Sequence, residues 1–132
     1  LKQWQMTELK QKFSLVNSEL PTISQDEALV KIAGCGVCHT DLSFWHDGVR
    51  TYKELLLTLG HELSGVVLEG PAHLKGKNVI IPAVLPCGDC ELCNKGRSNM
   101  CQNQLMPGND FHGGFATHIK VPHQHLCLVT LI

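Results

Sequence analysis

Residues Pro86–Cys101 read P-C-G-D-C-E-L-C-N-K-G-R-S-N-M-C and contain four of the seven cysteines in the chain. These are Cys87, Cys90, Cys93 and Cys101, in the spacing C-x2-C-x2-C-x7-C. Four thiolates on tight turns can surround one zinc ion in a closed tetrahedral shell, which leaves no position for a substrate. The segment therefore predicts a structural zinc site that holds together a lobe with little core of its own. The alternatives are a pair of disulfides or an iron–sulfur cluster.

The rest of the chain has the composition of an ordinary globular domain. Of its 132 residues, 43% are hydrophobic and 17% are charged, which allows one domain with a real core. A formal net charge of −1 gives no reason to expect nucleic acid or a membrane surface as a partner. The apolar runs are too short to cross a bilayer, and the opening L-K-Q-W-Q-M-T-E lacks the apolar segment of a signal peptide. We therefore expect a cytoplasmic protein.

Short alternating segments predict a mainly β fold. Strands are expected over residues 3–7, 13–16, 28–33, 63–69, 79–81 and 115–121, and in the apolar piece 126–132. One short helix is expected over 42–46, with Thr40 or Asp41 as its cap. Six or more short strands with Gly and Pro turns are typical of a barrel-like domain, and no linker divides the chain. We expect a single domain over residues 1–132.

A second set of potential metal ligands lies on two glycine-containing loops. Cys38 occurs in G-C-G-V-C-H-T-D, and His61 occurs in G-H-E. One thiolate and one imidazole make up part of a catalytic zinc shell, which needs three protein ligands and one open position. Glu62 could enter or leave that shell. Taken singly, a buried cysteine and a core histidine have commoner roles, so the prediction depends on the combination of motifs.

Two neighbours of Cys38 have side chains suited to support such a site. Asp41 could accept a hydrogen bond from the second ring nitrogen of His61 and so fix the tautomer of the imidazole. Thr40 has a hydroxyl that could relay a proton from a bound alcohol.

These motifs, in this order, resemble the N-terminal, GroES-like catalytic domain of the zinc-dependent medium-chain alcohol dehydrogenases over essentially the whole chain. The resemblance implies a mainly β, partly open barrel with short helices and a zinc-binding lobe. It also implies that Cys38 and His61 bind a catalytic zinc, and that the four cysteines of the lobe bind the structural zinc.

The same resemblance implies roles for four further residues. Thr40 resembles the hydroxyl that hydrogen-bonds the substrate oxygen, and Asp41 resembles the aspartate behind the ligands. Glu62 resembles the acid beside the metal, and His39 resembles the position that meets the pyrophosphate of the coenzyme. The implied reaction is oxidation of a small-molecule alcohol with NAD or NADP, in a full-length protein that forms a homo-oligomer.

Three segments resemble one branch of the family in particular. These are A-G-C-G-V-C-H-T-D-L-S, P-A-V-L-P-C and M-P-G-N-D-F-H-G-G-F-A-T-H-I. They are similar to the 6-hydroxycyclohex-1-ene-1-carbonyl-CoA dehydrogenases, which oxidise a ring alcohol on an acyl-CoA with NAD. No feature of the composition or the spacing indicates recognition of CoA.

The chain departs from the family pattern in three places. Ser43 stands where many relatives have a histidine that passes the proton to solvent, and Pro71 stands at the final position of G-H-E-x2-G-x5-[GA]. A third zinc ligand and a Rossmann coenzyme domain follow this domain in relatives. We therefore expect the 132 residues to be an inactive fragment of a longer enzyme. The alternatives are a zinc-stabilised GroES-like binding module without catalysis and a secreted domain held by disulfides.

Overall fold

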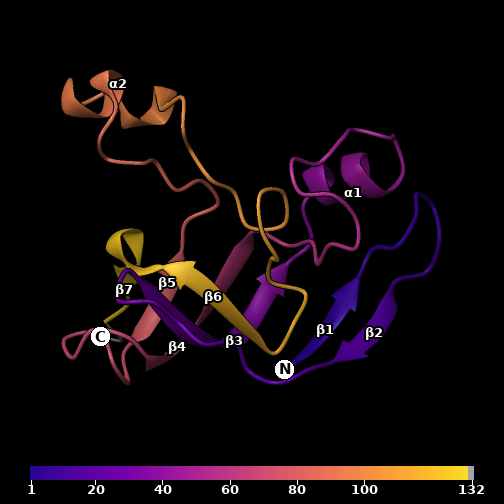
Figure 1. Ribbon diagram of the computed structural model, residues 1–132, viewed down its shortest axis with the longest axis horizontal. Coiled ribbons are helices and arrows are strands. Elements are labelled where there is room, and N and C mark those ends of the chain that lie inside the picture. Colours follow the sequence, from indigo (N-terminus) through magenta and orange to yellow (C-terminus); the bar gives the residue numbers. More distant parts are fainter. Residues whose placement is uncertain (131–132) are drawn as a thin grey trace.

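The computed structural model describes residues 1–130 and has two antiparallel sheets with a projecting lobe (Figure 1). The strands are β1 (Lys2–Gln5), β2 (Ser14–Asn17), β3 (Glu27–Gly36), β4 (Glu62–Glu69), β5 (Asn78–Ile81), β6 (His118–Pro122) and β7 (Cys127–Leu128). The helices are α1 (His39–Trp45) and α2 (Glu91–Asn94), with two 3₁₀ turns, η1 (Ser98–Met100) and η2 (His123–His125). The predicted mainly β fold with short helices is therefore confirmed.

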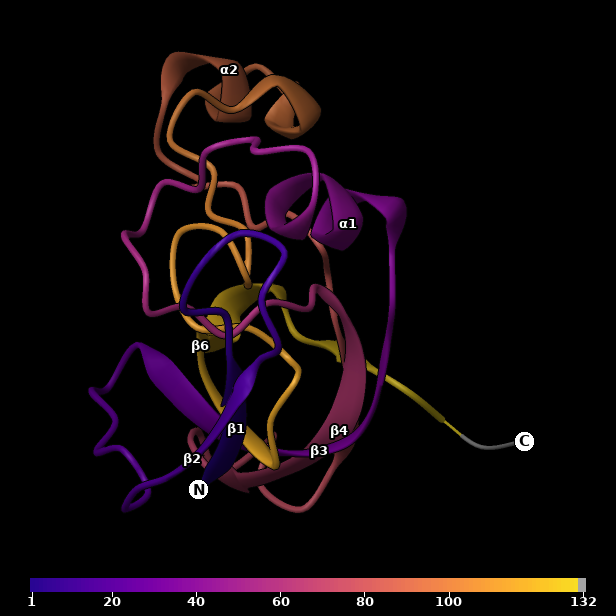
Figure 2. The same cartoon turned by 90° about the vertical axis from the view of Figure 1, so that its right-hand side faces the viewer.

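The larger sheet has five strands in the order β6-β3-β4-β5-β7, and β1 pairs with β2 in a separate ribbon. Register shifts in the β3–β4 pair, between Leu29 and Val30 and between Ile32 and Gly34, bend both strands, as Figure 2 shows. The sheet ends at β6 and β7 instead of closing on itself, which gives the partly open barrel. Helices α1 and α2 both lie above the sheets in Figures 1 and 2, at separate places.

Two groups of buried apolar side chains form the core. The main group comes from alternate positions of β3, β4, β5 and β6, with two residues from the following loops: Ala28, Val30, Leu63, Val67, Leu74, Val79, Ile81, Leu85, Ile119 and Val121. The smaller group, Met6, Phe44, Leu57 and Leu59, packs under α1. Gly65 belongs to the inward face of β4, where an added Cβ would lie 2.2 Å from the carbonyl oxygen of Lys31. Only glycine lets these two strands approach so closely.

Three predicted strands differ most from the structure in their boundaries, and the other four shift by one or two residues at their ends. The strand predicted at 28–33 continues to Gly36, because its last residues pair with the start of β4. The strand predicted at 115–121 is divided. Its first part, around Ala116, bridges to β1, and only His118–Pro122 pairs with β3. In the final predicted strand, β7 covers Cys127–Leu128, and residues 131–132 lie outside the described part of the chain.

The predicted cap of the short helix is wrong. Helix α1 begins at His39, and its N-cap is Cys38, which has an extended backbone conformation. Thr40 and Asp41 therefore lie inside the first turn. The Asp41 carboxylate reaches back and accepts a hydrogen bond from the Cys38 amide at 3.0 Å. An acidic side chain at this third helical position satisfies an amide that would otherwise lack a partner at the start of the helix.

Candidate metal centre

The pairing of β3 with β4 brings the two predicted ligand loops together. Gly36, the last residue of β3, pairs with Glu62, the first residue of β4. Cys38 follows that pair by two residues along one strand, and His61 precedes it by one residue along the other. Residues that are distant in the sequence therefore meet at one end of the sheet because the strands are antiparallel.

Cys38, His61 and Glu62 form a group whose ligand atoms all lie within 4.8 Å of one another. His61 is buried, Cys38 is half-buried and Glu62 is exposed. A sulfur, a nitrogen and an oxygen ligand at this separation suit zinc, which accepts all three donor types. The residues present therefore fit a zinc ion at this position.

Asp41 joins the two ligand loops. Its side chain is buried, and its carboxylate accepts hydrogen bonds from the amide of Cys38 at 3.0 Å and from the amide of Gly60 at 3.1 Å. Carboxylate Oδ1 also lies 3.5 Å from Nδ1 of His61, a contact longer than a well-formed hydrogen bond. Among the described residues, this buried Nδ1 has no hydrogen-bond partner. Since Nδ1 faces Asp41, Nε2 is the nitrogen left for a metal.

The other predicted site residues lie around this group. Oγ1 of Thr40 is 3.7 Å from Sγ of Cys38 and half-buried. His39 is exposed at the start of α1, and Ser43 is half-buried one turn further along. The structure therefore brings Thr40 and Asp41 to the Cys38–His61 pair. The roles predicted for Thr40, Asp41, Glu62 and His39 stay predictions.

The four cysteines of the lobe also form one group, with their sulfurs within 4.8 Å of one another. Sulfurs bound at about 2.3 Å to a tetrahedral zinc lie about 3.8 Å apart. Sγ of Cys90 and Sγ of Cys101 are 3.9 Å apart, which fits that shell. None of the seven cysteines forms a disulfide, so the structure does not support the disulfide alternative.

Backbone amides point at the sulfurs of the lobe. The Cys87 amide donates to Sγ of Cys101, and the Asp89 and Cys90 amides donate to Sγ of Cys87, at 3.3–3.4 Å. Such bonds favour thiolates. The Asp89 amide is the main cause of a lowered pKa at Cys87, and the Cys93 amide lowers the pKa of Cys90 to about 6.

Cys93 behaves differently from its neighbours. Loss of contact with water raises the pKa of its thiol to about 12, and the adjacent sulfurs add to the increase. The lobe can therefore hold some thiolates easily but resists a full set of four negative charges. A divalent cation would offset that repulsion. The donor set and its charge both fit zinc.

The lobe has little else to hold it together. It projects from the sheets (Figure 1), and among its described residues only Cys101 is buried. Helix α2 has four residues, too few to be stable alone. The metal would be the main source of order here, as it is in small structural zinc domains.

A family model of the alcohol dehydrogenase GroES-like domain matches residues 24–130. The chain belongs to this family. The GroES-like domain is 36% identical over 129 residues to an alcohol dehydrogenase of Geobacillus stearothermophilus, a match covering 94% of the chain and 38% of that protein. Zinc is the metal of this family, and both cysteine-containing groups fit it.

Solved structures support the same fold. Galactitol-1-phosphate dehydrogenase from Escherichia coli has a TM-score of 0.87 at 29% identity, over 98% of this chain and 38% of that one. An E. coli CFT073 structure described as a short chain alcohol dehydrogenase, complexed with NADH, has a TM-score of 0.85 at 26% identity, over 98% and 38%. The GroES-like domain thus spans less than two fifths of these relatives. No helix in the described residues is long and apolar enough to cross a membrane.

Sequence reasoning missed two features of this region. The hydrogen bond from the Gly60 amide to Asp41 joins residues on two separate loops, and no local sequence pattern predicts that these loops meet. The side chain of His112, to which no sequence motif assigns a role, is half-buried and accepts a hydrogen bond from the Thr58 amide at 3.2 Å. Only the fold places His112 beside the segment that leads to His61.

Proposed function

We propose that this GroES-like domain is the metal-binding part of a zinc-dependent, NAD(P)-linked alcohol dehydrogenase. The observation that carries the proposal is the convergence of Cys38, His61 and Glu62 beside Thr40 and Asp41. A structural module would need the cysteine lobe but has no use for a second, mixed ligand group at the edge of the sheet. Relatives that are alcohol and sugar-alcohol dehydrogenases support the same assignment.

Each residue of the group has a distinct task in this proposal. When bound, zinc supplies Lewis-acid chemistry at the alcohol oxygen. Cys38 and His61 hold the metal, and Glu62 is the third protein group close enough to join them. Thr40 takes the proton of the substrate hydroxyl and passes it outward. Asp41 keeps both ligand loops in position through its two amide bonds. His39, exposed at the start of α1, meets the coenzyme.

For the substrate we propose a cyclic hydroxyacyl-CoA. The support is the resemblance of three sequence segments to the 6-hydroxycyclohex-1-ene-1-carbonyl-CoA dehydrogenases. The full-length protein, which we expect to be a homo-oligomer, should then reduce NAD with such a ring alcohol faster than with threonine or galactitol 1-phosphate. A preference for one of the latter two would reject the acyl-CoA assignment and leave the dehydrogenase proposal intact.

The test of the dehydrogenase proposal is Cys38→Ala in the full-length protein. We expect turnover to be lost while the lobe keeps its zinc, so the bound zinc should fall from two ions per chain to one. The matched control is Cys127→Ala, which removes an exposed thiol outside both groups. Normal turnover in the Cys38 variant would contradict the proposal, and a full-length protein that reduces no coenzyme would favour the binding module.

A further inference from the structure

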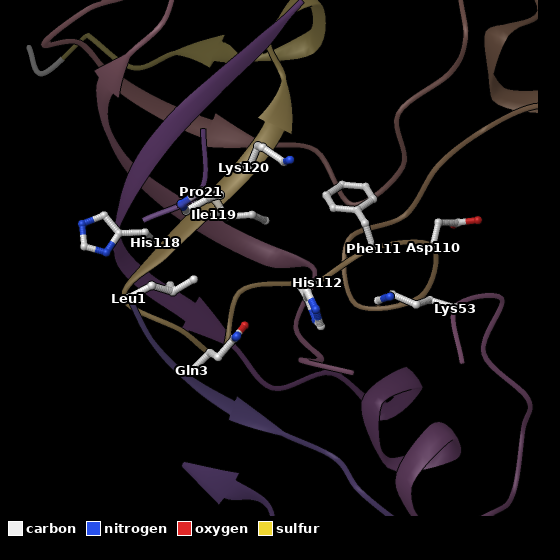
Figure 3. A pocket seen from close by; sticks show the side chains of 10 residues that line it. All are labelled: Leu1, Gln3, Pro21, Lys53, Asp110, Phe111, His112, His118, Ile119 and Lys120. Atoms are coloured by element: carbon white, nitrogen blue, oxygen red, sulfur yellow. The ribbon is translucent and has the colours of Figure 1, made fainter. Parts of the chain in front are cut away.

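A cavity of about 360 Å³ lies between the start of β1, strand β6 and the loop before Gly113 (Figure 3). None of the candidate metal ligands lines it. The side chains that matter for its chemistry are Gln3, Lys53, Phe111, His112, Ile119 and Lys120. A cavity of this size, apolar with a few polar groups, is typical of a site for a small molecule.

Two neutral donors are fixed in its wall by Thr58. The Thr58 amide donates to Nδ1 of His112 at 3.2 Å, so the proton of the neutral ring is on Nε2. The Thr58 hydroxyl donates to Oε1 of Gln3 at 3.0 Å, which leaves the amide nitrogen of Gln3 with two hydrogens to offer. Thr58 is fully buried and Gln3 is buried, so both donors are held in place.

The positive and negative side chains around the cavity differ in how available they are to a ligand. Figure 3 shows the ammonium end of Lys53 extending toward His112, with Lys120 at the edge of the cavity, while the carboxylate of Asp110 turns away. One Asp110 oxygen is also occupied, because it accepts a hydrogen bond from the Met106 amide at 2.8 Å. Nζ of Lys120 lies 3.6 Å from Oε2 of Glu27, so this ammonium already has a carboxylate partner. Lys53 is therefore the cation most available to a ligand.

The state of His112 agrees with this arrangement. Burial lowers the pKa of its imidazole, and the nearby Lys53 ammonium lowers it further. The ring is therefore neutral near pH 7 and keeps the tautomer that donates from Nε2. Phe111 and Ile119 supply the apolar part of the wall (Figure 3).

We propose that this cavity binds a small organic anion in which one carboxylate is attached to an apolar body. The carboxylate would accept hydrogen bonds from Lys53, His112 and Gln3, and the apolar body would lie against Phe111 and Ile119. No arginine lines the cavity. Lys53 supplies one available positive charge beside two neutral donors, which balances a singly charged carboxylate better than a phosphate that carries about −1.5 to −2 charges at pH 7.

The experiment uses the full-length protein with ¹³C-labelled isoleucine δ1 methyl groups and NMR titration. Benzoate is the probe, and benzamide is its neutral control of the same shape. The signal of Ile119, assigned through an Ile119→Val variant, reports on the cavity wall. We expect benzoate to move this signal, and benzamide to bind about tenfold more weakly, because a hydrogen bond to a charged group typically exceeds a neutral one by about the 1.4 kcal/mol of a tenfold change.

Two variants locate the anion. Lys53→Met should weaken benzoate binding about tenfold, whereas Lys75→Met, which removes an exposed lysine that does not line the cavity, should leave it unchanged. The affinity read at Ile119 should also be the same in Cys38→Ala, because the metal centre is a separate place. Equal binding of benzoate and benzamide, or no effect of Lys53→Met, would overturn the proposal. So would loss of the Ile119 response in the Cys38 variant.

Discussion

Replacing Asp41 with asparagine tests whether one carboxylate holds the two metal-ligand loops together. The carboxylate accepts two backbone hydrogen bonds, from the amides of Cys38 and Gly60, at 3.0 and 3.1 Å. Asparagine has one acceptor oxygen, so its NH₂ group must face one of these two amide donors. Each hydrogen bond to a charged group contributes about 1.5–3 kcal/mol, and a buried amide left without a partner costs about 1–3 kcal/mol.

We therefore expect Asp41→Asn to reduce the free energy of local opening at these amides by roughly 2–4 kcal/mol. Asp41 is only 3% exposed, so screening by solvent does not reduce this figure. Hydrogen exchange of peptides that contain Cys38 and Gly60 should accelerate at least about tenfold in the full-length protein. Zinc affinity at the Cys38–His61 site should fall about 10–100-fold, the usual cost of losing a group behind a ligand.

The control is Asp47→Asn, an exposed aspartate whose carboxylate pairs with the neighbouring His46. It should change neither exchange nor zinc affinity. If Asp41→Asn left the exchange of both amides within about twofold of the wild type, the two hydrogen bonds would not hold the loops, and the argument would be refuted.

Three further predictions follow from other parts of the molecule. Removing zinc with a chelator should open Cys87–Cys101 to proteolysis while the five-stranded sheet stays protected, because the lobe has little core. Cleavage of the sheet at the same rate as the lobe would contradict this. The pKa of His112 is lower in the folded state than its ordinary value of about 6.5. Between these two pKa values the unfolded chain therefore binds more protons than the folded one. The free energy of unfolding should decrease as the pH falls from about 6.5 toward the folded pKa. His112→Asn, which keeps an acceptor for the Thr58 amide, should lose less stability than the wild type between neutral and mildly acidic pH, and equal losses in denaturant titrations would reject this cause. Gly65→Ala should lower the free energy of unfolding by about 1–3 kcal/mol or more in the same titrations, because the new methyl group would collide with the Lys31 carbonyl. The control is Gly76→Ala, where nothing lies near the new methyl group and only backbone strain is tested.

The ligand residues could be predicted from sequence because each is marked by a local pattern. The four lobe cysteines have a spacing that lets their thiolates meet around one metal on tight turns. Cys38 and His61 each lie in a short glycine-containing motif. The strand 63–69 was predictable because a short, largely apolar run ends at Gly70 and Pro71, and β4 (Glu62–Glu69) confirms it.

What escaped prediction depends on contacts between distant segments. Helix α1 begins before the predicted cap because Asp41 is held by the Gly60 amide as well as by Cys38, so its side chain points into the protein. The predicted strand 115–121 is divided because Phe115 and Ala116 pair with β1 and the continuous pairing with β3 begins only at His118. The cavity beside His112 forms where β1, β6 and a loop come together, and local sequence periodicity does not predict such a contact between distant segments.

The pairing of β1 with residues near Thr117 has a consequence for how the domain is made. The Lys2 amide donates to Oγ1 of Thr117 at 3.0 Å, and the Thr117 amide donates to the Lys2 carbonyl at 2.8 Å, a connection between residues 115 positions apart. During synthesis, the first strand leaves the ribosome long before this partner exists. The apolar residues beside it stay open to water, or to chaperones, until the segment around Thr117 has emerged. This contact should therefore form late, as a closing event between two segments that lie far apart in the sequence.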